Sequence, residues 1–93
     1  MATIKNFEEL IAWQKARELA GSVYELTRHD KFSRDFGLRD QIQRAASSVM
    51  HNIAEGFDDG SDAEFIRFLK YARRSASEVQ SEIYLALDRK YVS

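Results

Sequence analysis

The sequence predicts an all-α protein, an antiparallel up-and-down helical bundle formed by one domain over residues 1–93. The chain contains no proline and only four glycines, so almost nothing interrupts helices. Its apolar residues recur at spacings of three and four, which is the period of an amphipathic helix. A chain of 93 residues forms one domain that buries only about 60% of its unfolded surface, so we expect self-association to add stability.

The first helix is expected over residues 7–28. Asn6 and Glu9 have the spacing of a capping box, which marks a helix start. The apolar stripe that follows is wide, as in a helix that packs against more than one neighbour. The stripe then fades into polar residues, which predicts a loop over residues 29–36.

Two further helices are expected, over residues 38–56 and 62–91. Gly56 is of the residue type that commonly ends a helix in the left-handed conformation. Ser61 and Glu64 repeat the capping-box spacing before the third helix. Its apolar stripe has a four-three repeat over three heptads, which predicts packing in a bundle. The stripe consists of Phe65, Leu69, Ala72, Ala76, Val79, Ile83 and Ala86.

Polar residues stand within the apolar end of the second helix. Asn52 falls on the apolar line, where an amide lowers stability but fixes register. Glu55 opposes the helix dipole, so we expect a basic partner for it. That partner is Arg44 of another subunit, since the two lie about three turns apart in one chain, or Arg17 or Arg73 of a neighbouring helix. We interpret this group as a structural or partner-contact network rather than a ligand site. Its members are Trp13, Arg44, Asn52, Glu55 and Gly56.

A basic stripe on the third helix is the candidate nucleic-acid contact. It places four positive charges within eight residues, with no acidic residue among them. Basic side chains interleaved with an aromatic ring bind phosphates and stack bases. The stripe consists of Arg67, Lys70, Tyr71, Arg73 and Arg74. The alternative is a solvated face, because Glu64 and Glu78 stand where they can form ion pairs with Arg67 and Arg74.

Four more basic residues are candidates to extend this surface, and acidic neighbours dilute their charge. The basic residues are Arg28, Lys31, Arg34 and Arg39, and the acidic ones are Asp30, Asp35 and Asp40.

Neither a metal site nor catalysis is expected. The chain has no cysteine, and its two histidines lie on different segments without further ligands. His51 and Glu55 are the one acid–base candidate, and we predict a protein without enzymatic activity or cofactor. No signal segment or membrane-length apolar run is visible, so we expect a cytoplasmic protein without a membrane partner.

Several separated runs of the sequence share a pattern with one protein family. The runs are Phe7–Leu10, Trp13–Ala16, Phe36–Leu38, Gln41–Val49, Asn52–Gly56 and Glu64–Glu78. Together they resemble the four-helix bundle proteins encoded in intervening sequences of 23S ribosomal RNA genes, the S23 proteins. The resemblance covers about residues 6–91. The chain departs from it at Ser33 and Met50, where many relatives have proline, and at Arg74, where many have glycine.

The resemblance implies a bundle that assembles as a homopentamer and has no known enzymatic activity. A relative with the same fold, the accessory variability determinant of diversity-generating retroelements, is a basic pentamer that binds a reverse transcriptase and nucleic acid. The implied partners are therefore further copies of the chain, RNA or DNA, and a nucleic-acid enzyme. The fourth helix of the family begins about where this chain ends, which implies an open apolar groove.

The sequence thus predicts a non-catalytic, self-associating bundle that binds nucleic acid or a nucleoprotein through basic surfaces. The alternative is an adaptor that binds a protein partner, such as a reverse transcriptase, through the groove. Salt separates the two hypotheses, because binding to phosphates weakens steeply as salt rises.

Overall fold

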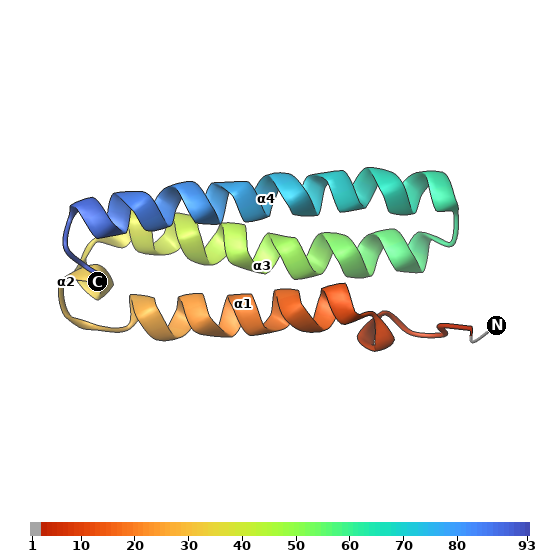
Figure 1. The fold of residues 1–93 in the computed structure, drawn as a ribbon, viewed down its shortest axis with the longest axis horizontal. Helices are drawn as coiled ribbons and strands as arrows, with labels where there is room; N and C mark the ends of the chain where they lie inside the picture. The colour runs from red at the N-terminus through yellow and green to blue at the C-terminus, as the bar shows by residue number, and fades with distance from the viewer. Residues whose placement is uncertain (1–2) are drawn as a thin grey trace.

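The three long helices of the computed structural model lie side by side in a bundle about 47 Å long (Figure 1). The structure describes residues 3–93. In chain order its elements are the 3₁₀ turn η1 (Phe7–Glu9), α1 (Ile11–Thr27), α2 (Asp30–Arg34), α3 (Phe36–Asp59) and α4 (Asp62–Asp88). The described part of the chain contains no strand, and the predicted all-α bundle is confirmed.

α1 and α4 run in the same direction, and α3 runs antiparallel to both (Figure 1). α3 is the central helix, and both of the others pack mainly against it. Small α2 covers the end of the bundle at which α1 passes into α3 (Figure 1). The core is divided along the bundle into two clusters. One contains Val23, Phe32, Leu38, Ile42 and Ala86, and the other Ala16, Val49, Ile53 and Ala72.

The first helix begins at Ile11, not at residue 7 as predicted. The capping interaction forms, since the backbone N–H of Asn6 donates to Oε2 of Glu9 at 2.9 Å. It caps only the single turn η1, because Leu10 is extended, with φ −73° and ψ 125°. The capping signal was therefore real, but the chain leaves the helical conformation one turn later.

The predicted loop over residues 29–36 is wrong in part, because it contains α2 and the start of α3. Phe32 is only 1% exposed and closes the end of the core. Asp35 then caps α3, and its Oδ1 accepts a hydrogen bond from the backbone N–H of Leu38 at 3.2 Å. Burial of one aromatic side chain thus folds a segment whose polar composition favours a loop.

Gly56 does not end α3, which is a second correction. The helix continues to Asp59, and Gly60, with φ 88°, takes the left-handed capping position. Gly56 lies buried where α3 meets α4, and a Cβ atom there would stand 2.6 Å from Cβ of Phe68. Its missing side chain therefore permits close helix contact rather than a helix end.

α4 begins after Ser61, whose Oγ accepts a hydrogen bond from the backbone N–H of Glu64 at 3.1 Å. It ends at Asp88, three residues before the predicted end. Lys90, with φ 62°, adopts the left-handed conformation that usually belongs to glycine. The backbone N–H of Tyr91 donates to the carbonyl oxygen of Ala86 at 2.9 Å, which is the closing bond of a Schellman motif.

After this turn the C-terminal strap, residues 89–93, folds back toward α2 (Figure 1). The rings of Tyr91 and Phe32 are 5.3 Å apart, and the Tyr91 hydroxyl donates to Oδ2 of Asp35 at 2.9 Å. Hydrogen bonds from Leu38 and Tyr91 lower the pKa of Asp35, and the bond to Asp35 raises the pKa of Tyr91. This attachment is lost when the pH falls through the lowered pKa of Asp35 or rises through the raised pKa of Tyr91.

Candidate nucleic-acid interface

The basic stripe occupies the first half of α4, and two of its arginines flank one tyrosine. The guanidinium carbons of Arg67 and Arg74 each lie 5.8 Å from the ring centroid of half-buried Tyr71. Arg67 also stands 5.3 Å from the ring of Phe68. These cation–π distances hold the two arginines along the helix surface, one turn on each side of the ring.

Most of the charge of the stripe has no acidic partner. Arg67 forms the predicted ion pair with Glu64. The second predicted pair, between Arg74 and Glu78, does not form. Across residues 3–93, no acidic side chain lies within 4 Å of Lys70, Arg73 or Arg74, which leaves three exposed positive charges close together.

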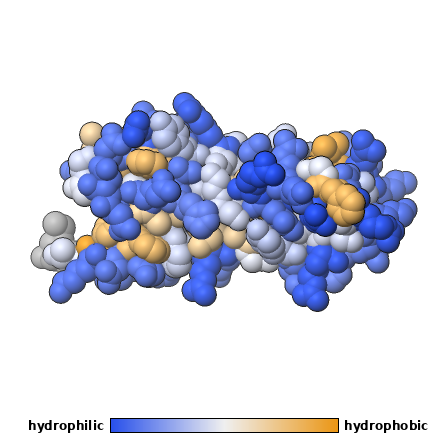
Figure 2. All heavy atoms as spheres, turned by 180° about the vertical axis from the view of Figure 1, so that it is seen from behind, coloured by the Kyte–Doolittle hydropathy of each residue, from blue (hydrophilic) through white to orange (hydrophobic). Residues whose placement is uncertain are grey.

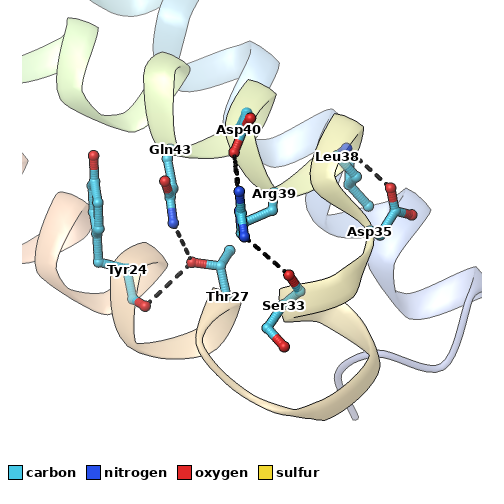
Figure 3. A network of polar contacts seen from close by, with 8 residues as sticks. All are labelled: Tyr24, Thr27, Ser33, Asp35, Leu38, Arg39, Asp40 and Gln43. Atoms are coloured by element: carbon cyan, nitrogen blue, oxygen red, sulfur yellow. Dashed lines mark hydrogen bonds and ion pairs between the residues drawn. The ribbon is translucent and has the colours of Figure 1, made fainter.

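The basic residues near α2 do not extend this stripe, contrary to the expectation from sequence. They lie at or beside the α2 end of the bundle, whereas the stripe lies in the opposite half of α4 (Figure 1). Arg28 pairs with Glu25 at 3.1 Å, and Arg39 pairs with Asp40 at 2.9 Å. Figure 3 shows Arg39 between Asp40 and the carbonyl oxygen of Ser33, to which it donates at 3.1 Å.

Asn52 takes part in a polar seam between α3 and α4. Its Nδ2 donates to the carbonyl oxygen and to Oγ of Ser48, both at 2.8 Å. Oγ of Ser75 in α4 donates to the same Ser48 hydroxyl at 2.9 Å. The amide therefore supports a hydrogen bond that joins two helices within one chain.

Arg44 and Glu55 are both exposed on α3, and the structure does not bring them together. Glu55 has no basic side chain within 4 Å among the described residues, so neither Arg17 nor Arg73 serves as its partner within the chain. Arg44 lines a shallow hollow of about 310 Å³ with Tyr24, Asp40, Gln43 and Ser47.

Trp13, at the start of α1, is half-buried against the second core cluster. Its ring meets that of Phe7 edge to face at 5.1 Å, and the Arg17 guanidinium lies 5.9 Å from its centroid. The residue thus joins η1 to the core and keeps one face toward the surface.

An apolar groove runs between α1 and α4, on a different side of α4 from the polar seam. Its volume is about 480 Å³, with Leu19 supplied by α1 and Ala76, Val79, Gln80, Ile83, Tyr84 and Leu87 supplied by α4. Tyr84 is 64% exposed and Leu87 39%. Figure 2 shows the face opposite to that of Figure 1, where hydrophilic atoms cover most of the surface and apolar atoms gather in separate areas.

Comparison with known proteins decides the family. The model of the 23S rRNA-intervening sequence proteins matches residues 8–93. The chain belongs to this family. No curated protein and no solved structure matches the chain. The function of the 23S rRNA-intervening sequence proteins is unknown.

This 23S rRNA-intervening sequence protein contains one buried acid that sequence reasoning missed. Glu82 is 7% exposed, and neither carboxylate oxygen has a hydrogen-bond partner in the part of the chain that the structure describes. It stands seven residues after Ser75 and so lies on the same line of α4, toward α3. Burial and the neighbouring Glu78 raise its pKa. The signal was available, since Glu82 falls between Val79 and Ala86 at helical spacing.

Metal and membrane signals are also lacking over residues 3–93. No group of three or more His, Cys, Asp or Glu side chains there could hold a metal ion. No helix in the same range is both long and apolar enough to cross a bilayer.

Proposed function

We propose that this family member is a non-catalytic, self-associating cytoplasmic bundle that binds nucleic acid through the basic stripe of α4. The observation that carries the proposal is the set of exposed cations without acidic partners, Lys70, Arg73 and Arg74, beside Tyr71. Such an arrangement binds the phosphate backbone with little reading of base sequence. Self-association would repeat the stripe and raise its avidity.

The test is a binding titration of labelled structured RNA and duplex DNA at low and moderate salt, with the oligomeric mass recorded on the same sample. Replacing Arg67, Lys70 and Arg74 by Glu should abolish binding and leave the fold intact. The milder pair Lys70→Gln with Arg74→Gln should reduce the slope of log K against log salt by about 2, since each phosphate contact contributes about 1.

Arg28→Gln is the matched control, because Arg28 is exposed but already paired with Glu25. It should leave the salt slope within about 0.5 of the unsubstituted protein. Unchanged binding by the Arg67, Lys70 and Arg74 variant would refute the contact. The recorded mass tests separately whether the oligomer contains five subunits, as the family resemblance implied.

The groove between α1 and α4 supports a second candidate function, binding of an amphipathic helix from a protein partner such as a reverse transcriptase. Apolar side chains line it, and the rim residue Tyr84 is largely exposed. Helices commonly bind in such grooves through apolar anchors. Partner binding that is lost in Ile83→Glu and is insensitive to salt would favour this function over the first.

A further inference from the structure

A hollow at the α2 end of the bundle contains both backbone outliers of the described chain. Its volume is about 310 Å³, and it is lined by Asp30, Lys31, Arg34, Lys90 and Tyr91. Asp30, with φ 42°, and Lys90, with φ 62°, are the only residues other than glycine with positive φ among residues 3–93. The left-handed turn at Lys90 ends α4 and directs the strap toward α2, and the one at Asp30 begins α2, so these two turns shape the hollow.

The lining of the hollow is positively charged. Lys31, Arg34 and Lys90 have no acidic side chain within 4 Å in the described structure. Asp30 is the one acid of the lining, so three cations face one anion. Neighbouring Asp35 forms no ion pair with any of the three cations, and its two oxygens accept hydrogen bonds from the Leu38 backbone and the Tyr91 hydroxyl.

The cations come from two segments that only the folded chain brings together. Lys31 and Arg34 belong to α2, whereas Lys90 belongs to the C-terminal strap. The contacts of Tyr91 with Phe32 and Asp35 hold the strap in place. The backbone N–H groups of residues 89–91 already donate to carbonyl oxygens at the end of α4, so the strap would contact a ligand through its side chains.

We propose that this hollow binds a phosphate group. An Arg guanidinium binds phosphate through parallel hydrogen bonds, and two Lys ammonium groups add point charges around it. The phosphate could be free inorganic phosphate or pyrophosphate, or the terminal phosphate of a nucleic acid. The site lies in the opposite half of the molecule from the basic stripe and does not depend on the function proposed for that stripe (Figure 1).

The test is a titration of the full chain at 0.15 M salt, monitored through the amide chemical shifts in ¹H–¹⁵N NMR spectra. The probes are inorganic pyrophosphate and a short single-stranded RNA with or without a 5′-phosphate. Saturable shifts centred on residues 30–34 and 89–91 are expected with pyrophosphate. A preference for the 5′-phosphorylated RNA would identify a nucleic-acid end as the source, and equal affinity for both RNAs would identify the free anion.

The variant Lys90→Gly distinguishes an effect on ligand binding from an effect on folding. Glycine accepts the left-handed conformation, so the variant should melt at a higher temperature. It also removes a cation from the lining, so pyrophosphate should bind about tenfold more weakly. Lys31→Gln should weaken binding similarly, whereas Lys15→Gln, an exposed lysine of α1, should not. Absence of saturable shifts, or equal weakening by Lys15→Gln, would overturn the proposal.

Discussion

Helix α4 meets its two neighbours in different ways. Toward α3 it packs closely, since Phe68 lies against Gly56, and Ser75 is hydrogen-bonded to Ser48. Toward α1 it presents larger apolar side chains such as Ile83 and Leu87, and a groove stays open. One helix thus forms a tight, register-specific contact on one side and an incomplete apolar contact on the other.

The difference shows that side-chain size and short polar groups decide how closely two helices approach. Small residues let backbones come together, and the hydroxyl–amide contacts around Ser48 specify one register. Large apolar residues bury themselves only in part when no third helix covers them. The seam therefore contributes to a unique fold, whereas the groove contributes a surface for a further helix.

The largest effect on the contact between α3 and α4 is expected from a side chain added where the two helices approach most closely. Gly56→Leu should lower the free energy of unfolding by about 3 kcal/mol, because even a Cβ atom would collide with Cβ of Phe68 at 2.6 Å. Gly21→Ala in α1 is the matched control, since a Cβ atom there would meet no atom of another described helix within 4 Å, and it should stabilise by about 0.5–1 kcal/mol. Urea unfolding measures both; equal signs for the two glycines would contradict the close contact.

Removing the unpaired acid Glu82 should stabilise the contact between α3 and α4. Glu82→Leu should raise stability at pH 7 by about 1–3 kcal/mol, the usual cost of a buried polar group without a partner. Because burial raises the folded-state pKa of Glu82, the stability that this residue contributes is fully present at acidic pH and is lost as the pH rises through the raised value.

The advantage of Glu82→Leu should therefore grow from pH 4 to pH 8 in urea unfolding experiments. Glu78→Gln, on the exposed surface one turn earlier, should change stability by less than about 0.5 kcal/mol. An advantage for Glu82→Leu that is constant across this pH range would show that its carboxylate does not titrate with the fold.

The polar part of the seam should have a smaller effect. Asn52→Ala removes the amide that donates twice to Ser48, and it should destabilise by about 1 kcal/mol. Thermal unfolding measures the loss, and Ser75→Ala, which removes the bond between the helices, should give a similar value. Stability equal to that of the unsubstituted protein would mean that water replaces these bonds without loss.

The smallest effect on folding is expected in the groove. Leu87→Ser alters a side chain that remains 39% exposed, and it should change stability by about 0.5 kcal/mol or less. The same substitution should weaken binding of a partner helix in the groove, measured by titration with that partner. A loss of stability as large as that of Gly56→Leu would erase the contrast between the two sides of α4.

Sequence periodicity predicted the fold because it reports which face of a helix is apolar. It placed Ala72, Val79 and Ala86 correctly in the core, but the same pattern cannot say which neighbour each side of the helix meets. Gly56 was predicted to end the second helix, and only the close contact with Phe68 and the left-handed φ of Gly60 show that the helix ends one turn later. Helix α2 escaped prediction because one tertiary contact of Phe32 outweighs a polar local sequence.

The candidate binding surfaces could be predicted from the sequence only where they lie on one helix. The stripe and its Glu64–Arg67 pair could be anticipated from spacing along one helix. The hollow at the α2 end could not, because it joins residues 30–34 to residues 90–91 through a turn that Lys90, a non-glycine residue, makes possible.

Because α3 lies at the centre of the bundle, the three long helices should not detach together when the protein partly unfolds. α1 packs mainly on α3 and leaves the groove side uncovered, so we expect it to detach before the α3–α4 hairpin opens. Amide hydrogens of α1 should then exchange with deuterium through a partial opening, at a lower free energy than those of α3 and α4. A partner helix bound in the groove would suppress this partial opening, so slower amide exchange in α1 would indicate that the groove is occupied.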